Sequence, residues 1–140
     1  MNKILIIGTT RKIVLDQNIY KIYSYFKHKN KKFEITLLTS DSEYVNNHVD
    51  NYVRLNEKFI NENTELLEEK YDIYFVCHMS KKFLEYLNIY SYLLKNHIFD
   101  IYLIFNDNTI MKRSLSNIKK YHIIFLYIIK KIYGKFLIRI

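Results

Sequence analysis

Several residue types that define whole classes of protein are scarce or missing in this chain of 140 residues. It contains no Pro, no Trp and no Ala, and only 2 Gly and 1 Cys. A single cysteine excludes a disulfide-stabilised scaffold and a cysteine-rich zinc module. The scarcity of Gly and Pro excludes collagen-like and low-complexity chains, and a hydrophobic content of 49% is too high for intrinsic disorder. The length predicts one domain over residues 1–140 with its own core.

Long hydrophobic runs are also missing. The apolar run at 4–7 is shorter than the roughly 7–15 residues of a secretory signal, and no small-residue cleavage site follows it. The stretch 121–129 is interrupted by His122 and falls short of the about 20 residues that a membrane-spanning helix needs. The sequence therefore predicts a cytoplasmic protein. Peripheral contact with the inner face of the membrane stays open.

Acidic residues are absent from the last quarter of the chain. Lys and Arg total 22 and Asp and Glu total 14, which gives a net charge of +8. The last acid is Asp107, and the basic residues after it account for the whole net charge. They are Lys112, Arg113, Lys119, Lys120, Lys130, Lys131, Lys135 and Arg139. A segment of one sign favours an anionic partner, although a solvated helix face accounts for it equally well.

What the chain does contain is an alternation of apolar runs with amphipathic segments. Apolar runs typical of strands buried on both faces predict strands at 3–9 and 72–78. Further apolar segments predict strands at 33–39, 52–55, 100–105 and 135–140. Helical spacing of apolar residues predicts helices at 13–29, 57–70, 81–96 and 115–133. This order predicts an α/β fold with a doubly wound, mostly parallel, Rossmann-like sheet of about five to six strands and helices on both faces.

Ligands of open parallel sheets bind beyond the carboxyl ends of the strands, and four such places carry polar residues. After the first strand, the amides, hydroxyls and guanidinium of residues 8–11 offer a phosphate site. The second place is 39–41, where Asp41 is either a ribose ligand or a capping residue. The third is 77–80, where His78 is a candidate general base or a ligand for a substrate hydroxyl. The structural alternative for His78 is a strand-end residue bonded to the next loop. The fourth is the turn at 106–108. The candidate substrate-binding residues are Gly8, Thr9, Thr10, Arg11, Ser80, Asn106 and Asp107.

Each of these places has a plain structural alternative. A strand-to-helix turn explains 8–11 without a ligand, because the Rossmann fingerprint needs three glycines and a Walker loop needs Gly-Lys-Ser/Thr. A lone buried Cys77 is expected to be inert. The five histidines show no ligand spacing, and the nucleophile-elbow and kinase motifs are missing. The sequence therefore predicts no metal site and no cofactor.

The helix expected at 115–133 combines charge with apolar surface. At about 100° per residue, two lysine pairs share one face and bracket an isoleucine and a tyrosine. This expected membrane or partner face consists of Lys119, Lys120, Ile123, Tyr127, Lys130 and Lys131. The pattern suits the headgroup boundary of an anionic membrane. Nucleic acid is not expected, because no nucleic-acid-binding module is recognisable.

The order of these segments resembles the amino-terminal domain of GT-B-type glycosyltransferases. The resemblance rests on the strands Lys-Ile-Leu-Ile-Ile-Gly at 3–8 and Phe-Glu-Ile-Thr-Leu-Leu-Thr-Ser-Asp at 33–41, on the strand openings Tyr-Asp-Ile and Phe-Asp-Ile, and on the helix and strand of 126–140. It implies a domain that handles the acceptor in polysaccharide or glycolipid synthesis. It also implies a partner domain or subunit that binds the sugar nucleotide, without which the chain is half of an enzyme.

Two other functions remain open on the sequence alone. The first is a non-catalytic α/β module that docks on an anionic membrane or an acidic partner through its basic carboxyl-terminal helix. The second is a small stand-alone nucleotide-binding enzyme, against which the missing glycine motifs count.

Overall fold

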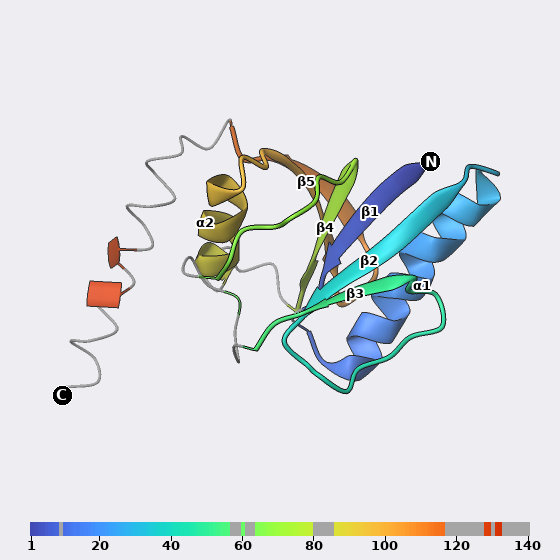
Figure 1. Ribbon diagram of the computed structural model, residues 1–140, viewed down its shortest axis with the longest axis horizontal. Coiled ribbons are helices and arrows are strands. Elements are labelled where there is room, and N and C mark those ends of the chain that lie inside the picture. The colour runs from blue at the N-terminus through green and yellow to red at the C-terminus, as the bar shows by residue number, and fades with distance from the viewer. Residues whose placement is uncertain are drawn as a thin grey trace.

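The computed structural model describes residues 1–8, 10–56, 60, 64–79, 86–116, 128–129 and 131–132 (Figure 1). Six strands and two helices are defined within these residues. In chain order they are β1 (Asn2–Ile7), α1 (Lys12–His28), β2 (Phe33–Thr39), β3 (Asn51–Arg54), β4 (Ile73–His78), α2 (Leu87–Lys95), β5 (Asp100–Phe105) and β6 (Ile110–Ser114).

The strands form one sheet in the order β3-β2-β1-β4-β5-β6. The first five strands in this order run parallel to one another, and β6 runs antiparallel to β5. The chain builds the sheet outward from β1 in one direction and then from β4 in the other, so the strand order reverses between these two central strands. This confirms the predicted α/β fold with a mostly parallel, Rossmann-like sheet. In such sheets the crevice at the reversal is the usual ligand position.

The core separates into two clusters that use alternate residues of the same strands. Ile4 and Ile6 of β1 belong to the cluster that contains the buried side chains of α1. Leu5 and Ile7 belong to the cluster that contains those of α2. Because successive residues of a strand point to opposite faces, α1 and α2 pack against different faces of the sheet. Figure 1 shows α1 on the side of β2 and β3 and α2 beyond β4.

The helix predicted at 57–70 is wrong for the residues that the structure describes. Residues 64–70 have no regular secondary structure and lie against α2, whose surface is buried on most sides. Asn96 accepts a hydrogen bond from the Leu67 amide at 2.8 Å, and the Tyr92 hydroxyl donates to the Glu65 carbonyl at 2.9 Å. Asn96 and Tyr92 thus form hydrogen bonds with backbone groups that a helix would pair with one another. Tertiary contacts therefore override the helical pattern of the sequence.

The strand β6 was not predicted at all. A turn over 106–108 reverses the chain after β5, with Asn108 in the left-handed region at a φ of 64°. The Phe105 amide donates to the Thr109 carbonyl at 3.0 Å, and the Asn108 amide donates to the Phe105 carbonyl at 2.9 Å. Asp107 accepts hydrogen bonds from both the amide and the hydroxyl of Thr109. This is the geometry of a hairpin with a three-residue loop.

Other expected elements fall partly or wholly outside the described residues. The helix expected at 81–96 is α2, which begins at Leu87, and residues 81–85 lie outside the description. Of the helix expected at 115–133, Leu115 and Ser116 form a turn, and residues 128, 129, 131 and 132 are helical. The strand expected at 135–140 lies outside. Within the part of the chain that the structure describes, no helix is both long and apolar enough to cross a membrane.

Candidate functional site

Two cavities open near the carboxyl edge of the parallel strands, and each is lined by some of the predicted site residues. The smaller, of about 100 Å³, lies where β1 and β2 end. Its lining includes Gly8, Thr10 and Lys12 from the turn into α1 and Thr39, Ser40 and Asp41 from the end of β2. The structure thus brings the first and second predicted places together.

Gly8 has a packing role in this small cavity. A Cβ atom built on Gly8 would lie 2.9 Å from Cδ1 of both Leu15 and Leu37. Both leucines are buried in the core, so they have little room to move. Glycine is therefore required here by the close approach of β1 to α1 and β2. A plain strand-to-helix turn therefore explains Gly8 without a ligand.

The far wall of the small cavity is held by a polar network. The Tyr44 hydroxyl donates a short hydrogen bond to Asp16 of α1, and Asn46 contacts both groups at 3.3 Å. Burial and the neighbouring Asp16 carboxylate raise the pKa of Tyr44 above its usual value. Arg54 fastens the same loop by donating to the backbone carbonyls of Asp41 and Tyr44. Tyr44 therefore stays a neutral donor at physiological pH.

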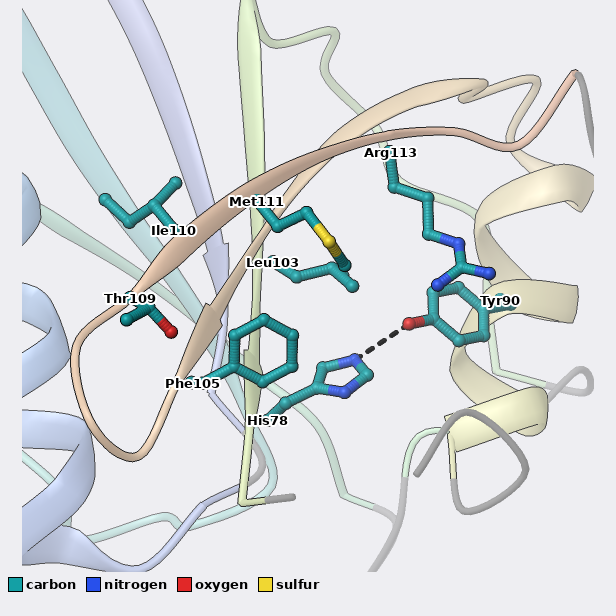
Figure 2. Close-up of a pocket in the computed structure, with 8 residues that line it drawn as sticks. All are labelled: His78, Tyr90, Leu103, Phe105, Thr109, Ile110, Met111 and Arg113. Carbon is teal, nitrogen blue, oxygen red and sulfur yellow. Dashed lines mark hydrogen bonds between the residues drawn. The ribbon is translucent and has the colours of Figure 1, made fainter. Parts of the chain in front are cut away.

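The larger cavity, of about 280 Å³, lies between β4, β5, β6 and α2 (Figure 2). His78 ends β4 and lines this cavity, so the third predicted place is at a cavity of its own. The remaining lining residues come from α2, β5 and the β5–β6 hairpin: Tyr90, Leu103, Phe105, Thr109, Ile110, Met111 and Arg113. Its walls are mainly apolar, with a few polar groups, which is the usual character of a small-molecule pocket.

Two tyrosines of the α2 region hold the His78 ring in place. The Tyr86 ring stacks on the imidazole at a centroid distance of 3.8 Å and an interplanar angle of 24°. The Tyr86 hydroxyl also accepts a hydrogen bond from the Met79 amide at 2.7 Å. The Tyr90 hydroxyl lies 2.9 Å from Nε2 of His78 in a buried hydrogen bond (Figure 2). The imidazole, only 1% exposed, is therefore fixed in orientation beside the cavity.

The charges around this cavity are positive. Burial raises the pKa of Tyr90, whereas the nearby Arg113 guanidinium acts in the opposite direction. Figure 2 shows the Arg113 side chain reaching from β6 toward the Tyr90 ring. The described lining contains no carboxylate. A ligand that carries hydroxyl groups or negative charge matches this arrangement of Arg113, Tyr90 and His78.

The fourth predicted place forms a turn and lines neither cavity. Asn106 and Asp107 are exposed and belong to the turn of the β5–β6 hairpin. Their neighbour Asn108 is tied to α1, because Asn18 donates to its side-chain oxygen at 2.9 Å and to the Phe105 carbonyl at 3.1 Å. Asn18 is fully buried, so the hairpin beside the larger cavity is anchored to α1.

Several other predicted residues do not reach a cavity in the described part of the chain. Arg11 is the exposed residue before α1 and makes no side-chain capping hydrogen bond; Lys12 lines the small cavity instead. Thr9 and Ser80 lie outside the described residues. So do Lys119, Lys120, Ile123, Tyr127 and Lys130 of the expected membrane face, while Lys131 is exposed.

Sequence reasoning missed most of the partners of His78. Tyr86 directly precedes α2 and Tyr90 lies one helical turn later, within it. This spacing indicates two rings on one side of the helix. Thr109 and Arg113 had no signal, because their strand was not predicted. Among the described residues no group of His, Cys, Asp and Glu is arranged to hold a metal ion. Burial raises the pKa of Cys77 to about 12, so its thiol is unreactive at neutral pH.

The fold and the cavities define a Rossmann-like α/β domain with a cavity beside His78 at the end of β4. Comparison with known proteins adds no name to this class: no protein-family model, no curated protein and no solved structure matches the chain.

Proposed function

We propose that this chain is an acceptor-binding domain for glycosyl transfer, with the acceptor held in the larger cavity beside His78. The observation that carries the proposal is the fixed orientation of the His78 imidazole at the carboxyl end of β4. The Tyr90 hydroxyl lies 2.9 Å from its Nε2, and His78 lines a cavity of about 280 Å³. The edge that bears it is where open α/β sheets bind their ligands. The resemblance of the strands to GT-B amino-terminal domains supports the same function.

The chemistry of the cavity suits a hydroxylated acceptor. Transfer to a sugar hydroxyl is assisted by a base that removes its proton, and histidine titrates close to neutral pH. Arg113 and Thr109 supply further polar groups, and Leu103 and Phe105 supply the apolar wall on which a sugar ring packs. The cavity is at the small end of the roughly 300–1,000 Å³ found for ligand pockets, which fits one sugar residue. His78 is the proposed base, and a separate donor-binding domain is the proposed partner.

A nucleotide site at the Gly8 turn is less well supported. The cavity there measures about 100 Å³, well below the usual range for small-molecule pockets. Gly8 is explained by packing against Leu15 and Leu37. These two observations favour the acceptor-binding function over a stand-alone nucleotide-binding enzyme.

Docking on an anionic membrane is the second candidate function. One observation favours it: Ile128 and Ile132, one helical turn apart, are 48% and 49% exposed, and Lys131 beside them is exposed as well. Apolar and basic side chains exposed together are typical of helices at the headgroup boundary. Vesicle sedimentation of the full chain, with Lys131→Glu and Ile132→Asp as variants, tests this candidate directly.

The acceptor proposal is tested by saturation-transfer NMR with a panel of monosaccharides and disaccharides. We expect binding by at least one sugar, loss of that binding when Met111→Trp fills the cavity, and weaker binding in Arg113→Gln. Met111 is 44% exposed, so the larger side chain can be accommodated without disturbing the core. Lys112→Gln is the matched control, because Lys112 is exposed on the same strand and does not line the cavity. Binding of no sugar, or equal binding by Met111→Trp, would overturn the proposal.

A further inference from the structure

A third recess, unrelated to the predicted sites, lies on the α1 side of the sheet. This α1 groove has a volume of about 490 Å³ and runs between the carboxyl-terminal half of α1 and strands β4, β5 and β6. It is larger than the cavity beside His78 and falls within the usual range for small-molecule sites. On this face α1 packs on the sheet, whereas α2 belongs to the opposite face, so the groove is not covered by either described helix.

The floor of the α1 groove is apolar and largely aromatic. Ile22 and Phe26 of α1 and Phe75 of β4 are all buried members of the core. The Phe75 and Tyr102 rings stack at 5.4 Å, and Phe26 meets Phe75 edge-on at 6.5 Å. The interlocked rings make a rigid surface. An apolar ligand would replace water over a preformed surface, which favours binding without a large ordering cost.

The mouth of the α1 groove carries positive charge. Lys29 and Lys31 line it and are exposed, Asn2 is its other polar residue, and the described lining contains no carboxylate. The Lys29 ammonium lies 4.5 Å from the centroid of the Tyr25 ring, which is 49% exposed at the rim. An apolar recess with cations only at its mouth complements a molecule that has an apolar tail and an anionic head.

We propose that the α1 groove binds a free single-chain amphiphile with an anionic headgroup, of the class of a long-chain carboxylate. The tail lies along the accessible side chains of Ile73, Tyr102 and Ile110, and the headgroup meets Lys29 and Lys31. A free molecule is favoured over a bilayer because the apolar surface is recessed, whereas a bilayer surface meets side chains that project. The groove shares only Ile110 with the lining of the cavity beside His78 and lies on the opposite face of the sheet, so the proposal goes beyond the acceptor-binding function.

The test is isothermal titration of the full chain with dodecanoate, below the concentration at which it forms micelles. We expect one molecule bound per chain and a loss of affinity on the order of tenfold for decanoate, which has two fewer methylenes to bury. Dodecylamine, with the same tail and the opposite charge, is expected to bind more weakly than dodecanoate. Equal affinity for the two charges would overturn the assignment of the headgroup to the lysines.

Two sets of variants test the contacts of the ligand's apolar tail and of its anionic headgroup separately. Lys29→Gln with Lys31→Gln is expected to weaken dodecanoate binding about fivefold, in line with exposed ion pairs, and to leave dodecanol binding unchanged. Lys21→Gln with Lys70→Gln is the matched control, because these exposed lysines do not line the groove. Ile110→Trp, at a residue that is 39% exposed, fills the groove and is expected to weaken every ligand.

Three results would refute the proposal. The first is no dodecanoate binding by the folded wild-type chain, with folding checked by circular dichroism. The second is binding that Ile110→Trp leaves unchanged, which would place the tail elsewhere. The third is sedimentation with phosphatidylglycerol vesicles that dodecanoate does not displace and that Lys29→Gln with Lys31→Gln abolishes, which would identify a bilayer as the occupant of the groove. Binding of sugars beside His78 is measured separately, so either site can fail without the other.

Discussion

The hydrogen bond between Tyr90 and His78 is expected to couple the two residues energetically. Tyr90→Phe removes the hydroxyl that lies 2.9 Å from Nε2 in a buried setting. A neutral hydrogen bond contributes about 0.5–1.5 kcal/mol net, and a buried polar atom left without that partner costs about 1–3 kcal/mol. Tyr90→Phe should therefore lower the free energy of unfolding by about 1–3 kcal/mol.

His78→Phe completes a double-mutant cycle, because it removes the polar partner and keeps a ring to stack on Tyr86. In the double variant neither polar group of the pair remains, so the sum of the single effects should exceed the effect of the double variant by about 1–2 kcal/mol. The assay is urea unfolding at pH 7 followed by circular dichroism, with all four proteins fitted with a common slope.

Tyr92→Phe provides the matched control for this cycle. Tyr92 lies on the same helix, but its hydroxyl donates to the Glu65 carbonyl rather than to His78. Tyr92→Phe and His78→Phe should therefore add within about 0.3–0.5 kcal/mol. If Tyr90→Phe and His78→Phe are equally additive, the hydrogen bond does not position the imidazole, and the argument for His78 as a fixed base fails.

Further predictions concern three buried groups, each checked by unfolding experiments. Gly8→Ala should cost about 1–3 kcal/mol by overpacking against Leu15 and Leu37, measured by urea unfolding. Asn18→Asp should destabilise the fold increasingly as the pH rises above about 4, because burial favours the protonated carboxyl; unfolding at pH 4 and pH 7 checks this. Burial raises the pKa of Cys77 to about 12 from 9.0, so the unfolded chain loses this proton first. Above about pH 9 the wild type should therefore lose about 1.4 kcal/mol per pH unit relative to Cys77→Val in thermal unfolding.

The sheet could be predicted because its central strands are buried on both faces. The run at 4–7 is wholly apolar and the run at 35–38 is interrupted only by Thr36, so neither has a polar face to place toward water, and such runs occur in parallel sheets covered on both sides. The spacing of Ile19, Ile22 and Phe26 likewise predicts α1, and all three are buried. Where burial decides the structure, the sequence pattern is sufficient.

Other parts were not predictable because contacts distant in sequence decide them. The acids at 65–69 are typical of the start of a helix. The segment is irregular instead, because its Leu67 amide donates to Asn96 and its Glu65 carbonyl accepts from Tyr92. The edge strand β6 is exposed on much of its surface and therefore lacks the alternation of a half-buried strand.

The candidate site was predictable in its position and not in its composition. The rule that ligands lie beyond strand ends indicated His78. Tyr90 was read as one more apolar position of a helix, since the pattern does not show that its hydroxyl meets an imidazole. The position of Arg113 at the cavity could not be predicted without β6. This antiparallel strand brings a residue from beyond the turn back over the cavity.

The hydrogen bonds made by Asn18 also connect the walls of the two cavities. The turn at the start of α1 lines the small cavity, and Asn18, farther along the same helix, holds the hairpin that borders the larger one. A ligand that displaces α1 must either break these two hydrogen bonds or carry the hairpin with it. If a ligand in the small cavity shifts α1, these hydrogen bonds couple that shift to the hairpin, and thermodynamic reciprocity requires the same coupling in both directions.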